Sequence, residues 1–298
     1  MTWLLTEDPD EYLAAAGAFL TSDPVANTIP LVAADRLRAR GGVASAGSVA
    51  SASRSPLFGW WRESDASVAG AFLHSPPYPP ILTSMTGQAA AALAEALAAR
   101  GRPLAGLNAD QVNGDAFVAV WQARTGDQPR IRRHSRLYRL GALTPARPQP
   151  PGRARMAGAG DRELLLAWHA AFRRETGSGP AADEAIVDDR LSYGGVTLWA
   201  ADQAAVSMAG VTRLLAGHVR VAPVYTPPQW RGHGYAAAVT SAVSQAALDA
   251  GARDVVLFTD LANATSNALY QRIGYRPVAD RVEWSFGPPR HGRTAEGS

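Results

Sequence analysis

The sequence of 298 residues contains no cysteine. This absence excludes a disulfide framework, a thiolate nucleophile and a metal site with thiolate ligands, and it fits a reducing compartment. Charged residues are also few, at 18% of the chain, whereas hydrophobic residues make up 47%. This balance is typical of a globular protein with a buried core and argues against a disordered one.

Targeting signals and membrane spans are missing as well. The chain begins MTWLLTEDPDEYL, which has acidic residues where a signal peptide needs a basic region followed by an apolar stretch. No apolar run approaches the roughly 20 residues that a membrane-spanning helix requires. We therefore expect a cytoplasmic protein without a membrane partner.

Charge of either sign is nearly balanced, with a net charge of +3 and a basic excess that is mostly scattered arginine. One short cluster stands out, formed by Arg130, Arg132, Arg133 and Arg136. Because no aromatic residues or known binding motif accompany it, we expect a solvated face and no nucleic-acid partner. A modest positive balance also suits a site for anionic phosphates.

A proline-rich stretch divides the chain. Residues 144–155, TPARPQPPGRAR, hold four prolines and a glycine between two patterned regions, which predicts a stiff linker. We therefore expect one domain at 1–143, a second at 156–290 and a disordered tail at 291–298. A second stretch, 41–55, is rich in Gly, Ala and Ser and predicts a mobile surface loop.

The second domain is expected to alternate helices and strands, which follow from helical or alternating spacing of apolar residues between turn signals. We expect a strand near 155, helices at 161–175 and from 183, strands at 196–201, 206–215 and 218–225, a helix at 234–250, a strand at 255–258, a helix at 265–273 and final strands within 275–286. The three consecutive strands suggest an antiparallel meander. The continuous apolar run at 255–258 is typical of a buried strand parallel to a neighbour.

The first domain gives a similar order. We expect strands at 3–6, 57–62, 68–74, 81–85, 103–107 and 135–140, and helices within 8–20, 24–40, 88–100 and 111–124. This similarity suggests a diverged internal duplication. The expected fold class is α/β, with a mixed, mostly antiparallel central sheet flanked by helices in each of two tandem domains.

The segment between the strand at 218–225 and the next helix carries the clearest chemistry. It reads Thr226-Pro-Pro-Gln-Trp-Arg-Gly-His-Gly-Tyr-Ala236. Two prolines stop the strand, and two glycines let the backbone turn tightly and approach a ligand. The free amides of the first helical turn and the positive end of the helix dipole then form an anion site, to which Arg231 adds a charge. Nothing here supplies the Lys-Ser/Thr pair of a nucleoside triphosphate loop, so a pyrophosphate without catalytic magnesium is the better ligand, and we expect no metal.

Two motifs in this half resemble the signatures of the GNAT superfamily of acyl-CoA N-acyltransferases. Arg231, Gly234 and Ala236 match Arg/Gln-x-x-Gly-x-Gly/Ala. After the next strand, the segment 263–275, NATSNALYQRIGY, resembles Asn-x-x-Ala-x-x-Leu-Tyr-x-x-x-Gly-Phe/Tyr, with Ser266 in place of the usual Ala. The resemblance covers roughly residues 155–286, and the N-terminal half resembles the family only in outline.

The resemblance implies direct transfer of an acetyl group from acetyl-CoA, the cosubstrate, to a primary amine in a ternary complex. A backbone amide near Val224 would stabilise the oxyanion, Tyr270 would protonate the departing thiolate, and Asn263 would hold the pantetheine arm or the following helix. The resemblance implies these cofactor-binding residues: Val224, Tyr225, Thr226, Arg231, Gly232, His233, Gly234, Tyr235, Ala236, Asn263 and Asn267. The N-terminal half has only Thr86-Gly87 at the equivalent point, so we expect no second cofactor site there.

The general base stays open among several carboxylates. Glu175 is placed slightly ahead, because the helix that it ends usually borders the acceptor site in the family. The other candidates are Asp260, Asp183 and Glu184. The partner is expected to be a small-molecule amine, among which amino acids, aminoglycosides and the amino-sugar thiol of mycothiol synthases all stay open, as do protein amines and a homodimer.

Several of these candidate residues also fit purely structural roles. Tyr270 fits a core tyrosine, Asn263 a helix cap, and Glu175 and Asp260 fit surface acids. Two other functions also stay open. One is an NAD-dependent oxidoreductase, since Gly232-x-Gly234-x-x-Ala237 fits a dinucleotide pattern, although too little chain follows Asp260 for that fold. The other is a non-catalytic module that binds CoA or a metabolite.

Overall fold

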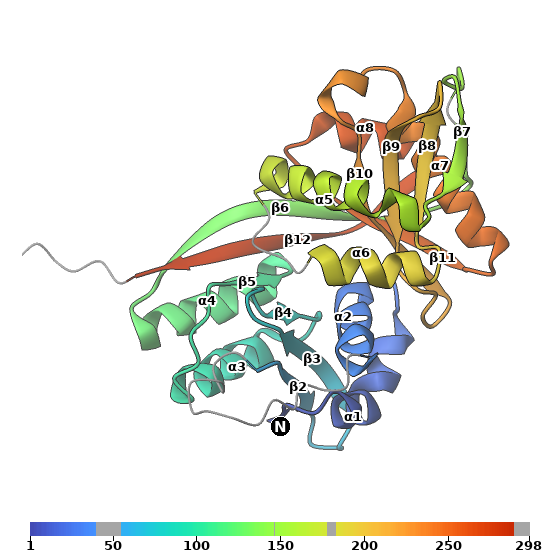
Figure 1. The fold of residues 1–298 in the computed structure, drawn as a ribbon. Coiled ribbons are helices and arrows are strands. Elements are labelled where there is room, and N and C mark those ends of the chain that lie inside the picture. Colours follow the sequence, from blue (N-terminus) through green and yellow to red (C-terminus); the bar gives the residue numbers. More distant parts are fainter. Residues whose placement is uncertain (40–54, 146, 178–182, 289–298) are drawn as a thin grey trace, which may run out of the picture. The chain divides into compact units, whose positions relative to one another are not determined.

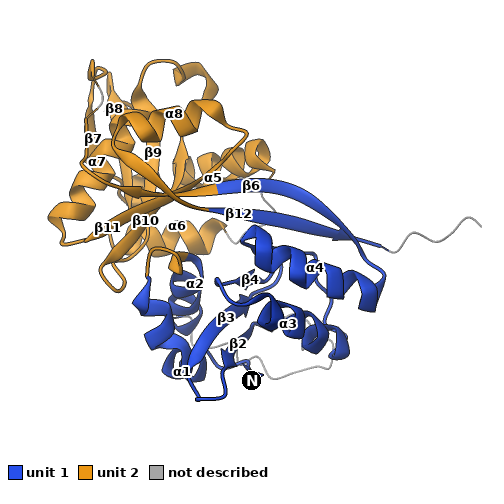
Figure 2. Cartoon of the chain, turned by 180° about the vertical axis from the view of Figure 1, so that it is seen from behind, with its two compact units in different colours: residues 1–23, 29–135, 280–298 blue, residues 24–28, 136–279 orange. Residues whose placement is uncertain are grey.

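The computed structural model describes residues 1–39, 55–145, 147–177 and 183–288. The chain forms two compact units (Figures 1 and 2). Unit 1 comprises residues 1–23, 29–135 and 280–298, and unit 2 comprises residues 24–28 and 136–279. Both are mixed α/β units built on a mostly antiparallel sheet, which confirms the fold class expected from the sequence.

Unit 2 alternates strands and helices along the chain. Its strands, in chain order, are β7 (Arg153–Met156), β8 (Val196–Ala201), β9 (Ala204–Val211), β10 (His218–Tyr225) and β11 (Asp254–Asp260). Its helices are α5 (Arg162–Thr176), α6 (Asp183–Ser192), α7 (Tyr235–Asp249) and α8 (Ala264–Arg272), with short 3₁₀ turns at Ala159–Asp161 and Pro228–Trp230. Strands β7 to β10 form an antiparallel meander, and β11 is parallel to β10.

Helices cover both faces of this sheet. Alternate residues of β8 enter two different cores, since successive strand residues point to opposite faces. Val196 and Leu198 pack with α5 and α6, whereas Trp199 and Ala201 pack with α7 and α8. Most of α7 is buried, and its many alanines suit both helix formation and close packing on the sheet. The sheet of unit 2 is therefore the middle of three layers.

Unit 1 repeats this plan. Its strands are β1 (Thr2–Thr6), β2 (Leu57–Arg62), β3 (Val68–His74), β4 (Ile81–Leu82) and β5 (Gly106–Ala109), and its helices are α1 (Pro9–Ser22), α2 (Thr28–Ala39), α3 (Gly87–Ala99) and α4 (Gln111–Thr125). Helices α1 and α2 pack on one face with Phe58 and Trp60, and α3 and α4 pack on the other with Leu57 and Phe72. The order of elements thus recurs from one unit to the other.

The last strand of each half belongs to both units. Strand β6 (Gln128–Leu140) has residues up to Ser135 in unit 1 and the rest in unit 2, and β12 (Tyr275–Gly287) passes from unit 2 into unit 1 at Asp280. In unit 1 the order is β1-β2-β3-β4-β5-β12-β6, and in unit 2 β11 is the neighbour of β6. Strand β12, from the C-terminal half, is therefore the neighbour of β5, and β6, from the N-terminal half, is the neighbour of β11.

Several expected boundaries differ from the structure. Strand β6 begins at Gln128 instead of 135, β4 is shorter than expected, and β5 begins three residues later than the expected strand. Residues 275–287 form one strand where more than one was expected. The compact units divide the chain inside β6 and β12, whereas the expected domains divide at 144–155. The expected loop at 41–55 falls almost wholly, and the expected tail wholly, outside the described residues.

Among the described residues, no helix combines the length and the apolar character needed to cross a membrane.

Candidate functional site

Strands β10 and β11 of unit 2 diverge after a short parallel ladder. Their register runs from His218 opposite Asp254 to Arg220 opposite Val256. Both strands continue beyond that point, β10 to Tyr225 and β11 to Asp260. On its other side β10 remains paired with β9 as far as Tyr225. The parallel ladder between β10 and β11 therefore ends before either strand does.

The loop that follows β10 ends in two glycines with left-handed backbone. Gly232 has φ of 80° and Gly234 has φ of 82°, a region that other residues rarely adopt. Among the described residues, a Cβ atom would meet nothing within 4 Å at Gly232 and only Pro150, at 3.9 Å, at Gly234. The requirement for glycine here is therefore conformational.

Helix α7 begins directly after Gly234, which supplies no side-chain cap to the first turn. The first N–H groups of a helix have no partner within it, and the helix dipole places partial positive charge at this end. Arg231 lies just before them, where its Nε donates to the Thr226 carbonyl at 2.9 Å. The junction from β10 to α7 thus has the features of an anion site.

Two sequence-predicted residues from distant parts of the chain meet beside this loop. The Nη2 of Arg231 donates to Oε2 of Glu175 at 2.6 Å, and the Tyr225 hydroxyl donates to Oε1 of the same carboxylate at 3.2 Å. Burial, followed by the nearby Glu175 charge, raises the pKa of Tyr225. Trp168 of α5 packs against the Tyr225 ring at 6.1 Å between centroids. Glu175 is therefore placed within the candidate site.

Tyr270 lies in the core of unit 2, with 8% of its surface exposed. Its ring packs edge-on against Tyr275 at 6.0 Å, and burial raises its pKa to about 12. The Tyr275 hydroxyl is engaged by Ser244 Oγ at 2.7 Å, whereas no hydrogen bond of the Tyr270 hydroxyl is found within the described part of the chain. The ring of Tyr270 is thus part of the core of unit 2. Its hydroxyl is protonated at neutral pH.

The two asparagines of the second motif organise the start of α8. Asn263 is the N-cap, since its Oδ1 accepts from the Ser266 amide at 3.0 Å. Asn267 Nδ2 donates to the carbonyls of Asp260 and Asn263, both at 2.8 Å, and its Oδ1 accepts from the Tyr138 hydroxyl at 2.9 Å. The Asn263 side chain therefore caps α8 and the Asn267 side chain ties α8 to the end of β11, and any contact of theirs with a cofactor stays a prediction.

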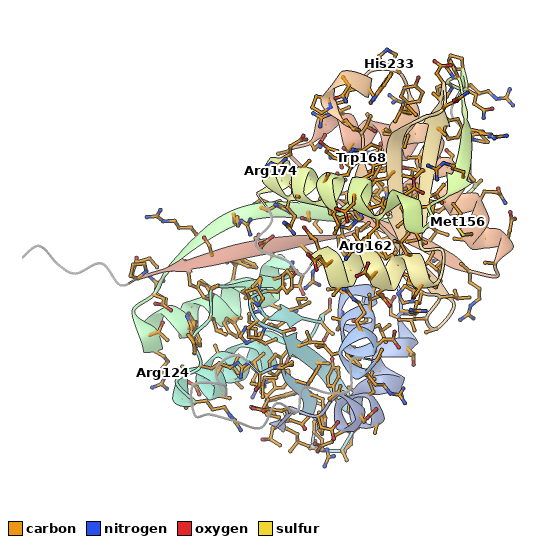
Figure 3. The ribbon with its side chains drawn as sticks, in the orientation of Figure 1. Arg124, Met156, Arg162, Trp168, Arg174 and His233 are labelled. Carbon is orange, nitrogen blue, oxygen red and sulfur yellow. The ribbon has the colours of Figure 1, made fainter. Side chains whose placement is uncertain are left out.

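The remaining residues of the predicted loop flank the junction. Thr226 Oγ1 lies 2.8 Å from Ser207 Oγ, which ties the end of β10 to β9. His233 is exposed at an outer end of unit 2 (Figure 3), and its ring stacks on Tyr235 at 5.7 Å. Tyr235 is buried in the core and Ala236 is half-buried in the first turn of α7. His233 thus contributes a stacked ring beside the amides.

The other candidate bases are held in local interactions. Asp183 forms an ion pair with Arg173, and Asp260 Oδ1 accepts from the Ala262 amide at 2.8 Å. Glu184 is exposed. Glu175, in contrast, accepts hydrogen bonds from Tyr225 at the end of β10 and from Arg231 of the loop.

Sequence reasoning missed a buried histidine on α5. His169 is 6% exposed, and burial together with the charges of Arg190 and Arg173 lowers its pKa to about 4. Its Nε2 lies 3.4 Å from Nη1 of Arg190, whose Nη2 donates to the Ala222 carbonyl at 2.5 Å. His169 lies at helical spacing from Leu165 and Phe172, which indicates that it shares their buried face of α5. The sequence analysis considered only the apolar residues of this face.

Comparison with known proteins was made at the levels of sequence and fold. Residues 163–275 match the model of the acetyltransferase (GNAT) family. A search of curated proteins gave no match. A GCN5-related N-acetyltransferase from Sphaerobacter thermophilus is similar in structure, with a TM-score of 0.62, 16% identity and coverage of 95% of each chain.

Two further solved structures extend this likeness. A GNAT-family acetyltransferase from Colwellia psychrerythraea has a TM-score of 0.58 and 10% identity, covering 96% of this chain and 100% of its own. A Drosophila protein has a TM-score of 0.63 and 13% identity, covering 96% of this chain and 99% of its own. At these identities the likeness establishes the fold alone, and it extends over nearly the whole chain.

Proposed function

We propose that this protein transfers an acetyl group from acetyl-CoA to a primary amine in a ternary complex, since residues 163–275 match the model of the acetyltransferase (GNAT) family. The observation that carries the proposal is the start of α7, where Gly234 leaves the first-turn amides without a side-chain cap next to Arg231. This junction suits the pyrophosphate of CoA, with the loop 231–236 as its cradle.

The pantetheine arm would lie where β10 and β11 diverge. The ladder between them stops at Arg220 and Val256, so backbone groups of the later residues are available to a ligand. Val224 follows the irregular part of β10, and its N–H would donate to the thioester oxygen and stabilise the negative charge of the tetrahedral intermediate. Tyr225, Thr226, Asn263 and Asn267 would border the cofactor at the two strand ends.

The chemical step joins the amine nitrogen to the thioester carbon and breaks the carbon–sulfur bond. Tyr270 donates its phenolic proton to the departing thiolate of CoA, since its raised pKa keeps it protonated at neutral pH. Because a thiol has a pKa of about 8.5 and leaves tolerably well as an anion, this acid accelerates the reaction without being indispensable. The tyrosine recovers its proton from solvent.

Glu175 is the proposed base that takes the proton of the amine. In the ligand-free protein its carboxylate holds Arg231 at 2.6 Å. If Arg231 turns to the pyrophosphate when CoA binds, Glu175 loses this partner and its oxygen becomes able to accept a proton directly or through water. The order of events would then be cofactor first and amine second.

The acceptor is proposed to be a small amine, and the reaction is proposed to need no metal. The absence of a recognised nucleic-acid motif and the composition of the chain favour a small-molecule partner in the cytoplasm. A homodimer is compatible with this function.

The test is to mix the full-length protein with acetyl-CoA and a panel of amino acids, amino sugars and aminoglycosides, and to measure free thiol and acetylated product. We expect thiol release that depends on one class of amine, with one CoA bound per chain by calorimetry. CoA binding without turnover for any amine would favour a non-catalytic module. Binding of a nicotinamide dinucleotide in place of CoA would contradict the proposal.

A further inference from the structure

Strand β10 contains an irregularity directly before the proposed oxyanion amide. Val221 is opposite Val211 on β9, but Val224 is opposite Ala209, so Ala222 and Pro223 together face the single residue Gly210. A bulge of this kind leaves backbone groups without their ladder partners and re-aims the residues that follow. Pro223 has no N–H to contribute. The direction of the Val224 amide therefore depends on how the bulge is held.

Arg190 of α6 holds the bulge from outside the sheet. Its Nη2 donates to the Ala222 carbonyl at 2.5 Å, and a charged donor of this kind makes a stronger hydrogen bond than a neutral one. A Cβ atom at Gly210 would lie 2.7 Å from the Ala222 oxygen and 3.2 Å from the guanidinium carbon of Arg190. The glycine thus leaves room for both groups, and a side chain there would force them to move.

His169 contacts the same guanidinium. Its Nε2 lies 3.4 Å from Nη1 of Arg190. Burial and the charges of Arg190 and Arg173 keep the ring neutral at pH 7, because they lower its pKa to about 4. In the tautomer with the proton on Nδ1, the ring is an acceptor for Arg190. Arg190 of α6 therefore contacts both the Ala222 carbonyl of β10 and His169 of α5.

We propose that Arg190 is a positioning residue for acyl transfer, which holds the Ala222 carbonyl and thereby fixes the Val224 amide at the place where negative charge develops. The inference rests on the proposed function. A donor that stabilises a transition state does so because it is already oriented, so small displacements of it reduce the rate with little effect on cofactor binding. Arg190 acts through the backbone of β10 and is not assigned a contact with substrate.

The experiment compares Arg190→Met with Arg213→Met. Arg213 is the control, since its Nη2 binds Asp189 and Ser192 of α6 at 2.8 and 3.2 Å and its guanidinium stacks on the Tyr193 ring at 4.1 Å. Arg190→Lys is the second variant, because it keeps the charge but lacks the two-pronged geometry. For each variant we measure amide hydrogen exchange over residues 218–226, CoA affinity, turnover and Tm.

We expect Arg190→Met to speed exchange in this segment by about ten-fold and to lower kcat by roughly 10- to 100-fold, with CoA affinity within about two-fold of the parent. Added guanidinium should restore part of the turnover, and Arg213→Met should behave as the parent. Unchanged exchange in both Arg190 variants would overturn the inference, whether or not the parent turns over. Parallel losses of CoA affinity and Tm in both the Met variants would also overturn it. A parent that turns over no amine contradicts the proposed function instead, and the exchange measurement still decides the role of Arg190.

Discussion

The two units share an order of elements but differ where the fourth strand passes into the next helix. In unit 1, the N-cap Thr86 accepts from the Ala89 amide at 3.2 Å, so a side chain occupies the first turn of α3. In unit 2, Gly234 stands at that position with left-handed backbone and leaves the first turn of α7 open. A capped helix end has less to offer an anion. The two helix starts therefore differ at one position, which a threonine side chain caps in unit 1 and a glycine leaves uncapped in unit 2.

A second difference lies between the fourth and fifth strands. In unit 1, Nη2 of the buried Arg281 donates to the carbonyls of Leu82 on β4 and Asn108 on β5, at 2.7 and 2.9 Å. The guanidinium therefore bridges these strands beyond the bridge of Ile81 and Asn108. The corresponding strands of unit 2, β10 and β11, diverge after Arg220. A buried arginine side chain thus links the fourth and fifth strands of unit 1, whereas the ladder between the corresponding strands of unit 2 has ended.

The units also differ at the residue proposed as general acid. Substitution of this residue is expected to have the largest effect on turnover. Tyr270 lies seven positions after the N-cap Asn263 of α8, and Phe117 lies seven positions after the N-cap Asp110 of α4. Tyr270→Phe makes unit 2 like unit 1 at this point and removes only the hydroxyl. We expect kcat to fall by roughly 10- to 1000-fold with little change in CoA affinity, measured by steady-state kinetics beside a melting curve. Normal turnover in a stable variant would remove Tyr270 from the mechanism.

The next effect concerns the open helix end. Gly234→Val should lower CoA affinity by about ten-fold or more, because the branched side chain disfavours the left-handed backbone that presents the amides. Gly251→Val is the control, since Gly251 also has a left-handed backbone, with φ of 92°, and nothing lies within 4 Å of its Cβ position. Calorimetry should show the affinity loss only for Gly234→Val. Equal affinity in the two variants would contradict the loop assignment.

A smaller effect is expected from the arginine side chain that links β4 and β5 in unit 1. Arg281→Met leaves the carbonyls of Leu82 and Asn108 without this donor, which should cost about 1–3 kcal/mol of unfolding free energy. Denaturant melts measure this loss. Because α3 remains capped by Thr86, CoA stoichiometry should stay at one per chain. A second bound CoA, in the parent or in the variant, would show that unit 1 retains a cofactor site.

Much of this organisation follows from local sequence. The strands at 57–62, 68–74, 196–201 and 218–225 have the expected bounds, because alternating or continuous apolar runs between turn residues determine them locally. The loop glycines carry their own signal as well, since only glycine adopts their backbone readily.

What the sequence did not predict depends on distant partners. The arginine-rich start of β6 lacks an apolar alternation, so the strand that extends back to Gln128 was not recognised. The pairing of Glu175 with Arg231 joins residues 56 positions apart, and that of Arg190 with Ala222 joins residues 32 apart. The placement of β6 beside β11 likewise depends on tertiary contacts. A chain cut at 144–155 would remove the second part of β6 from unit 2. Local sequence patterns do not predict this, because the pairing of β6 with β11 joins distant segments.

The smallest expected effect tests a feature that the units share. Each holds a buried histidine beside an arginine, namely His74 with Arg102 in unit 1 and His169 with Arg190 in unit 2. Burial, followed by the neighbouring positive charge, lowers the pKa of both histidines to about 4. The unfolded chain, with an ordinary pKa near 6.5, therefore binds more protons than the folded chain between pH 6.5 and pH 4. Stability should fall as the pH drops through 6.5 and level off near 4.

Between pH 7 and pH 6 each histidine should account for about 0.5–1 kcal/mol of this loss. Replacing either by Gln removes its titration, so His74→Gln and His169→Gln should each flatten the pH dependence of the unfolding free energy by that amount, whatever their effect on stability at pH 7. Urea melts at pH 6, 6.5 and 7 measure the slope. If only one of the two buried variants alters the slope, the units differ in this histidine–arginine pair too. If neither variant alters the slope, neither ring is held neutral by its surroundings.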